Sequence, residues 1–151
     1  MDITFVIIAY NQERRIIEAL ESVKYQVLNY LQGKKVQLIV ADDCSKDNTV
    51  HNTTLWLEEN SSLFVRIDFE VAEKNRGTCK NIANAYRKIQ AERFMSLAAD
   101  DLVANVDVFS ILNSYGKNEI VACVPYVFSD KKIIRNRERY LWGIVPYFFS
   151  K

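Results

Sequence analysis

Two pairs of carboxylates in this sequence come directly after short apolar runs, where their chemistry could serve a ligand. Asp42 and Asp43 follow the run VQLIVA, and Asp100 and Asp101 follow RFMSLAA. Adjacent carboxylates repel each other and gain nothing from burial. Each pair is therefore either a solvated turn or a place where hydroxyl groups, N–H groups or a metal ion meet the chain.

Two further polar clusters follow apolar runs. Tyr10 and Asn11 come after ITFVIIA, and the segment EKNRGTCK brings Arg76 and Lys80 to the start of a predicted helix. Carboxylates near cations at a helix N-terminus favour a metal ion and a phosphate together, because Mg²⁺ and Mn²⁺ bind carboxylate oxygens and are often shared with a phosphorylated ligand. Simpler explanations stay open, since aspartates are common in turns, cations are common on helix surfaces, and Asn11 could equally cap a helix.

The elements that position these clusters alternate between strands and helices. Apolar, often β-branched runs predict strands, and apolar residues at spacings of three and four predict helices. The expected strands are 3–9, 36–41, 63–72, 93–99 and 120–127, and the expected helices are 13–30, 48–59, 78–91 and 107–115. This alternation predicts a parallel sheet with right-handed crossovers, and such sheets bind ligands at the carboxyl ends of their strands. All four polar clusters fall at that edge.

Length and composition restrict the class of protein. With 151 residues, of which 49% are hydrophobic and 26% charged, we expect one globular domain over 1–151. The formal net charge of +1 gives no reason to expect a nucleic-acid partner. The three cysteines form no CxxC pair, which disfavours a disulfide framework or a zinc site. We see no signal peptide and no apolar run long enough to span a bilayer, so we expect a cytoplasmic location.

The last part of the chain, DKKIIRNRERYLWGIVPYFFSK, is basic and then aromatic. A basic run is usually a solvated face. A peripheral contact with the anionic inner face of a membrane, which would suit a lipid-linked acceptor, stays open beside it. No polar segment follows to complete a domain, so we expect the natural protein to continue beyond Lys151.

Four segments together resemble the successive motifs of the family-2 glycosyltransferases, and the resemblance covers residues 3–103. These segments are FVIIAYNQERRIIEALESV, LIVADDCSKDNT, NRGTCKNIANAYRK and FMSLAADD. The resemblance implies the GT-A fold, an α/β, Rossmann-like three-layer sandwich with a mostly parallel central sheet, here with the acceptor-binding part largely missing. It also implies inverting transfer of a sugar from a nucleoside-diphosphate sugar, such as a UDP-sugar, to a hydroxyl of a saccharide or lipid-linked acceptor. Such reactions build cell-surface polysaccharides and glycoconjugates.

The resemblance assigns a nucleotide-binding role to residues after the first two strands. Ala9 and Tyr10 would line the base or ribose pocket, with Asn11 beside them. Asp42 would accept a hydrogen bond from the base. Asp43 stays open between a ligand contact and a turn.

The resemblance assigns the diphosphate and the metal to the later clusters. Arg76 and Lys80 match a segment near the nucleotide and its diphosphate. Asp100 would face the ribose and the sugar, and Asp101 would hold Mg²⁺ or Mn²⁺. The metal would act as a Lewis acid that neutralises the diphosphate leaving group.

The sequence departs from the family pattern in two places. Many members carry a further acid at the position of Ala98 or Ala99, which leaves fewer carboxylates for the metal. The family's catalytic base lies further along the chain, and the later acids Glu119, Asp130 and Glu138 match no motif. The catalytic base therefore stays unknown.

Three other classes of protein are alternatives to a family-2 glycosyltransferase. A nucleotidyltransferase would need a glycine-rich loop after the first strand, where this chain has YNQERR. A phospho-acceptor signalling domain would carry its acidic pair after the first strand rather than the second. A non-catalytic module that binds a sugar nucleotide without turning it over stays open.

Overall fold

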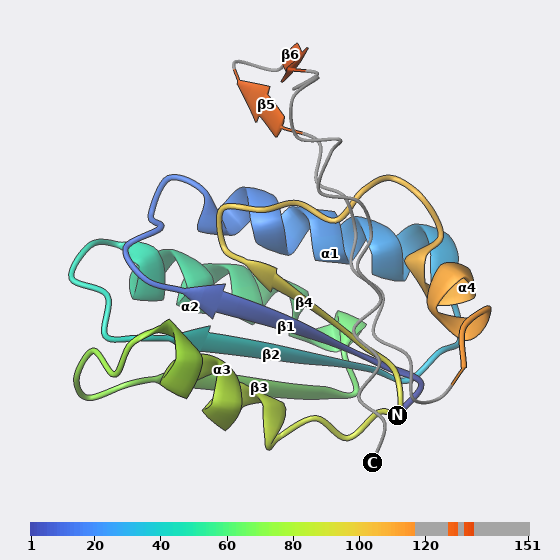
Figure 1. Cartoon of the computed structure of the whole chain (residues 1–151), viewed down its shortest axis with the longest axis horizontal. Coiled ribbons are helices and arrows are strands. Elements are labelled where there is room, and N and C mark those ends of the chain that lie inside the picture. The colour runs from blue at the N-terminus through green and yellow to red at the C-terminus, as the bar shows by residue number, and fades with distance from the viewer. Residues whose placement is uncertain (117–126, 130–131, 135–151) are drawn as a thin grey trace. The chain divides into compact units, whose positions relative to one another are not determined.

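The computed structural model describes residues 1–116, 127–129 and 132–134. The chain divides into two units, Met1–Ser114 and Tyr115–Lys151, which we describe separately. The elements of the first unit, drawn in Figure 1, are β1 (Ile3–Ala9), α1 (Ile16–Tyr30), β2 (Val36–Asp42), α2 (Thr49–Asn60), η1 (Ser61–Leu63), β3 (Arg66–Val71), α3 (Thr78–Tyr86), β4 (Phe94–Ala98) and α4 (Val108–Asn113). In the second unit β5 (Val127–Ser129) pairs with β6 (Lys132–Ile134) in an antiparallel two-stranded sheet.

The central sheet has four strands in the order β3-β2-β1-β4, and every neighbouring pair is parallel. The parallel sheet predicted from the alternation of elements is therefore confirmed. The arrowheads in Figure 1 show that the carboxyl ends of these strands lie at the same edge of the sheet. That edge carries the loops in which the polar clusters lie.

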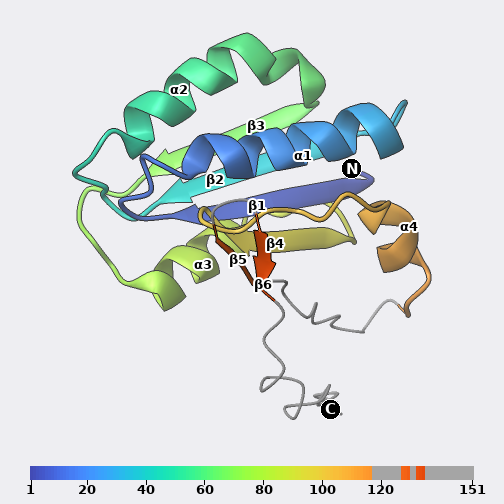
Figure 2. The same cartoon turned by 90° about the horizontal axis from the view of Figure 1, so that it is seen from above.

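Helices cover both faces of the sheet, which gives three layers (Figure 2). On one face, Phe5 and Ile7 of β1 pack in a core with residues of α1 and α2, such as Leu20 and Trp56. On the other face, alternate strand residues meet Ala85 of α3 in a smaller core. Because successive residues of a strand point to opposite faces, both cores draw on the same strands. The expected three-layer α/β architecture is confirmed.

Helix α1 begins at Ile16, later than the predicted residue 13. The preceding segment forms a turn in which the carbonyl of Gln12 accepts the N–H groups of Arg15 and Ile16. The side chain of Glu13 is used elsewhere, because its Oε2 accepts the N–H of Asn48 at the start of α2. Glu13, which the apolar spacing had assigned to the first helix, is therefore bound to the segment that starts the second.

Helix α3 ends at Tyr86 rather than at residue 91. A buried glutamine on β2, Gln37, stops it by donating to the carbonyl of Lys88 (2.9 Å) and accepting the N–H of Gln90 (3.0 Å). Strand β3 also begins later than predicted, at Arg66, because Ser61–Leu63 forms a short 3-10 helix. The predicted strand 120–127 lies outside the described residues except for Val127, which begins β5.

In the described part of the chain, no helix is long and apolar enough to cross a membrane. The basic and aromatic segment predicted to touch a membrane lies outside the described residues, apart from the backbone of β6. The membrane contact, the cytoplasmic location and the single-domain organisation of the chain stay predictions.

Candidate active site

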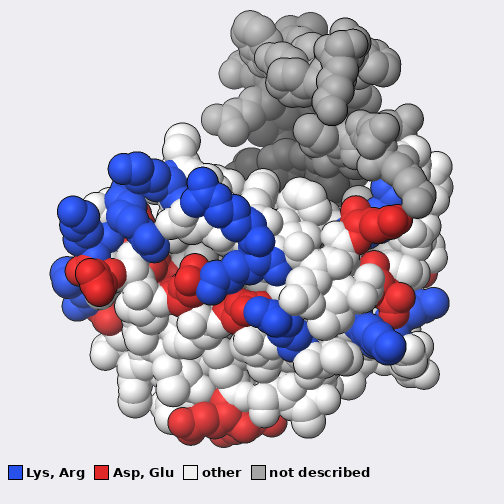
Figure 3. All heavy atoms as spheres, turned by 90° about the horizontal axis from the view of Figure 1, so that it is seen from below, with Lys and Arg blue, Asp and Glu red and all other residues white. Residues whose placement is uncertain are grey.

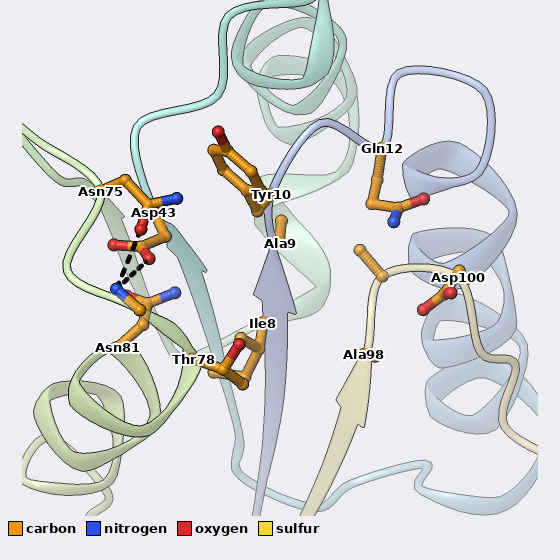
Figure 4. Close-up of a pocket in the computed structure, with 12 residues that line it drawn as sticks. Ile8, Ala9, Tyr10, Gln12, Asp43, Asn75, Thr78, Asn81, Ala98 and Asp100 are labelled. Carbon is orange, nitrogen blue, oxygen red and sulfur yellow. Dashed lines mark hydrogen bonds between the residues drawn. The ribbon is translucent and has the colours of Figure 1, made fainter.

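A pocket of about 310 Å³ opens at the carboxyl edge of the sheet, between the loops after β1, β2 and β4 and the start of α3 (Figure 4). In Figure 4, Asp43 and Asn81 lie on one side of it and Asp100 lies on the other, with Tyr10 between them. The residues that line it are Ile8, Ala9, Tyr10, Gln12, Asp43, Asn75, Gly77, Thr78, Asn81, Ala98, Ala99 and Asp100. The structure therefore brings together polar side chains from the loops after all four strands and from the start of α3.

Asp43 is buried and connects β2 to the start of α3. Its two carboxylate oxygens accept the backbone N–H groups of Arg76 and Gly77, each at 2.8 Å. Gly77 has a φ of 83° and a ψ of 152°, a conformation essentially restricted to glycine. Asn75 Oδ1 accepts the same Gly77 N–H at 3.0 Å. The second acid of the pair, Asp43, thus accepts hydrogen bonds from the backbone at the start of α3 and also lines the pocket.

Asp42 is buried too, and its contacts lie away from the pocket. It accepts the N–H of Ser45 at 2.7 Å and also the hydroxyl of Ser45. Ser45 Oγ in turn accepts the N–H of Asn11 at 2.8 Å, and Asn11 Oδ1 accepts the N–H of Lys46 at 2.8 Å. Asn11 therefore joins two loops, and the alternative that it caps a helix is wrong.

The pleat of the strands explains why the two acids have different partners. Ala41 belongs to the core that packs against α3. Because alternate residues of a strand share a face, Asp43 lies on the same face as Ala41 and points toward α3. Asp42 points to the opposite face. On β1, Ile8 packs against the same core, so Tyr10 follows Asp43 to the pocket side. Strand parity was the signal in the sequence that could have separated Asp43 from Asp42.

The loop after β1 is held to the start of α2 by backbone N–H groups that donate to side chains. Asp47 Oδ2 accepts the N–H of Glu13 at 3.0 Å, while Gln12 donates its N–H to the hydroxyl of Thr49 at 2.7 Å. Burial acts to raise the pKa of Asp47, but hydrogen bonds from Thr49 and from the backbone of Glu13 outweigh it and lower that pKa. The wall of the pocket that carries Tyr10 is therefore tied to the start of α2.

Asp100, predicted to face the ribose and sugar, and Asp101, predicted to hold the metal, lie after the end of β4. Asp100 lines the pocket, whereas Asp101 is the next residue and lies outside its lining. Both are exposed, and neither carboxylate pairs with another described residue. No group of three or more His, Cys, Asp or Glu side chains gathers in the described residues. Two unshared carboxylates suit a Mg²⁺ or Mn²⁺ ion that keeps several waters and is held jointly with a diphosphate.

Arg76 and Lys80 occupy the positions that the sequence predicts for the diphosphate, at the N-terminus of α3. Their side chains are exposed and form no ion pair with any residue that the structure describes, and neither lines the pocket. Figure 3 shows Lys and Arg side chains gathered on the face that carries α3. Unpaired cations beside a helix N-terminus favour a phosphate. Their contact with a nucleotide stays a prediction.

Several lining residues were not among the predicted site residues, and Gly77, Thr78 and Asn81 at the start of α3 are three of them. Asn81 is buried and donates from Nδ2 to the carbonyl of Ala41 at 2.8 Å, which fixes α3 against β2. Of the predicted nucleotide-binding residues, the pocket contains Ala9, Tyr10 and Asp100. Those outside its lining, whose roles stay predictions, are Asn11, Asp42, Arg76 and Lys80.

Comparison with known proteins identifies the family. The family model described as Glycosyl transferase family 2 matches residues 4–151. A search of curated proteins finds no match. The fold resembles that of S. aureus TarS in complex with UDP, with a TM-score of 0.61 and 22% identity over 74% of this chain and 31% of that chain.

Two further solved structures have a similar fold. S. aureus TarS in complex with UDP-GlcNAc has a TM-score of 0.57 and 24% identity over 68% of this chain and 27% of that chain. The mannosyltransferase PcManGT from Pyrobaculum calidifontis, in complex with GDP-Man and Mn²⁺, has a TM-score of 0.58 and 23% identity over 67% of this chain and 28% of that chain. This chain thus spans less than a third of the length of each of these neighbours. From the family match and the shared fold we conclude that the chain belongs to glycosyl transferase family 2 and has the GT-A fold.

Proposed function

We propose that this chain binds a nucleoside-diphosphate sugar in the pocket at the carboxyl edge of the sheet. The whole protein would transfer the sugar to an acceptor hydroxyl. The observation that carries the proposal is the pocket itself, in which buried Asp43, exposed Tyr10 and exposed Asp100 converge from three separate loops. The complexes of the similar structures with UDP, UDP-GlcNAc and GDP-Man support a ligand of this class.

Asp43 is the residue best placed to accept a hydrogen bond from the base. Each carboxylate oxygen carries two lone pairs, and the N–H groups of Arg76 and Gly77 use one on each. The others remain available on the pocket side. Tyr10, whose side chain is 45% exposed beside it, offers a face on which a base can stack. Asp42 would act through Ser45, which it holds, rather than on the base directly.

Asp100 would accept hydrogen bonds from the ribose and sugar hydroxyls, and Asp101 would hold Mg²⁺ or Mn²⁺ together with the diphosphate. A bound metal would neutralise the charge that develops on the leaving diphosphate. Arg76 and Lys80, at the positive end of α3, would attract the same phosphates. The Mn²⁺ in the mannosyltransferase complex supports a divalent ion in this class of site.

We propose inversion at the anomeric carbon, by direct attack of the acceptor hydroxyl, in the synthesis of a cell-surface polysaccharide or glycoconjugate. The acceptor would be a saccharide or a lipid-linked saccharide, presented to a cytoplasmic enzyme at the inner face of the membrane. We assign no catalytic base within this chain. These steps rest on the family's chemistry and on the donor pocket.

A thermal-shift panel tests the donor site. UDP-, GDP- and CDP-linked sugars are added with and without Mn²⁺, and the midpoint of unfolding (Tm) is measured. A nucleotide present at about 100 times its Kd adds about 2.7 kcal/mol to the unfolding free energy. That amount corresponds to an increase in Tm of about 5–10 °C for a domain of this size. If none of the sugar nucleotides raises Tm, the pocket is not a donor site.

A further inference from the structure

The loop between β4 and α4, residues 99–107, carries Asp100, predicted to face the sugar, and Asp101, predicted to hold the metal, and contains no helix or strand. Two buried valines anchor it, Val103 in its middle and Val108 at the start of α4. A loop packed against a core must find partners for its backbone N–H and C=O groups. In this loop many of those partners are side chains of α1.

Three side chains on one stripe of α1 contact the loop. They are Ser22, Gln26 and Tyr30, whose four-residue spacing places them on the same side of a helix. Ser22 Oγ accepts the N–H of Val103 at 3.0 Å, and the hydroxyl of Tyr30 donates to Asn105 Oδ1 at 3.0 Å. Gln26 lies between these two contacts.

Gln26 makes three hydrogen bonds with this segment. Its Nε2 donates to the carbonyl of Ala104 at 2.8 Å and to that of Val106 at 3.0 Å. Its Oε1 accepts the N–H of Val108 at 3.5 Å. Both amide hydrogens and the carbonyl are thus used on residues 104–108, and no other contact of this side chain is needed to satisfy it.

The burial of Gln26 shows that this contact is specific rather than incidental. Its side chain is 0% exposed and lies beside Val23 and Val27, which belong to the apolar face of α1. A leucine would suit such a face, and burying an amide is unfavourable unless it is fully hydrogen-bonded. The hydrogen bonds to residues 104–108 therefore explain why this buried position carries an amide and not an apolar side chain.

We propose that Gln26 is a positioning residue for the metal and diphosphate site. By fixing residues 103–108 to α1, it sets where the preceding Asp100 and Asp101 point at the end of β4. The inference rests on the proposed function, because it concerns how that site is held in place. Gln26 is not among the residues that line the pocket, so it would act through the loop and not on the ligand.

The test compares two buried glutamines in the full chain. Gln26→Leu removes the amide at nearly constant volume, and Gln37→Leu is its matched control. Gln37 is also 0% exposed and makes four hydrogen bonds, but it lies near the amino end of β2, away from the pocket. The measurements are amide hydrogen exchange of residues 99–108 and the Kd values of UDP, GDP and CDP with and without Mn²⁺.

We expect Gln26→Leu to accelerate exchange in residues 99–108 and to weaken Mn²⁺-dependent nucleotide binding about 10- to 100-fold, the usual effect of removing a group that orients metal ligands. Metal-free nucleotide affinity should not change. Gln37→Leu should lower Tm without either effect. Ser22→Ala, a smaller change in case Gln26→Leu does not fold, should shift both measurements in the same direction by a smaller factor.

The outcomes separate this inference from the proposed function. Unchanged exchange in both α1 variants, or faster exchange with an unchanged Mn²⁺-dependent Kd, overturns the positioning role while leaving the donor site intact. An equal loss of Mn²⁺-dependent affinity in Gln37→Leu also overturns it, because the effect would then be one of general stability. A wild-type chain that binds no nucleotide at all overturns the donor site, and with it the role of Gln26 toward the metal.

Discussion

Replacing Asp43 by asparagine tests whether the second acid holds the pocket together. The carboxylate accepts two backbone N–H groups, from Arg76 and Gly77, at 2.8 Å each. Asparagine has one oxygen and one NH₂ group, so it can accept one of these and must turn a donor toward the other. A hydrogen bond to a charged group contributes about 1.5–3 kcal/mol, so we expect Asp43→Asn to lower the unfolding free energy by about that amount.

Two measurements follow from this estimate. For a domain of this size, the loss corresponds to a decrease in Tm of about 3–12 °C. The variant should also lose nucleotide affinity, measured by titration with UDP, GDP and CDP, because the start of α3 and the acceptor for the base are disturbed together. Urea unfolding provides the free energy independently of temperature.

Asp68→Asn is the control for this experiment. Asp68 lies in the middle of β3 and accepts hydrogen bonds from Arg66 and Gln37, so its loss should also destabilise the fold. It is not part of the pocket lining, and nucleotide affinity should be retained. An Asp43→Asn variant with the wild-type Tm and wild-type nucleotide affinity would refute the argument. Equal losses of affinity in both variants would show that only general stability is being measured.

Three further changes have definite expected outcomes. Gly77→Ala forces an L residue into φ 83°, so the unfolding free energy from urea titration should fall by about 1–3 kcal/mol. Asp101→Asn should remove the Mn²⁺-dependent part of nucleotide binding in calorimetry, and an unchanged Mn²⁺ response would place the metal elsewhere. Burial would raise the pKa of Asp47, but hydrogen bonds from Thr49 outweigh it and lower that pKa from its ordinary value of 3.8. Its contribution is therefore present above about pH 4 and lost as the pH falls through the lower folded-state pKa, and the stability difference between Asp47→Asn and wild type should shrink there.

The order of strands and helices could be predicted because it depends on local patterns. Strand β1 has the predicted bounds, Ile3–Ala9, since its apolar run is bounded by polar residues on both sides. The start of α1 and the end of α3 could not be predicted. They depend on Glu13 accepting the N–H of Asn48 and on Gln37 binding the carbonyl of Lys88, contacts between residues more than 30 positions apart in the chain.

The location of the candidate site could be predicted from the sequence, but which of its residues face the pocket could not. Parallel strands place all their carboxyl ends at one edge, and this alone brings Tyr10, Asp43 and Asp100 into one pocket. Which acid of the first pair faces that pocket depends on which side of the sheet carries α3. Strand parity puts Asp43 on the same face as Ala41 and Asp42 on the other, but the sequence does not say which face carries α3; the packing of Ala41 against that helix supplies this.

The two faces of the sheet therefore differ in what they contribute at its carboxyl edge. On the α3 face, the strand ends present side chains to the pocket. On the face of α1 and α2, Asp42 holds the loop after β2 through Ser45, and Gln26 holds the loop after β4. Residues on this second face can change ligand affinity only by moving residues on the first. A substitution there should thus alter metal or nucleotide binding in proportion to the loop motion it causes, whereas Tyr10→Ala should weaken binding without changing hydrogen exchange in either loop.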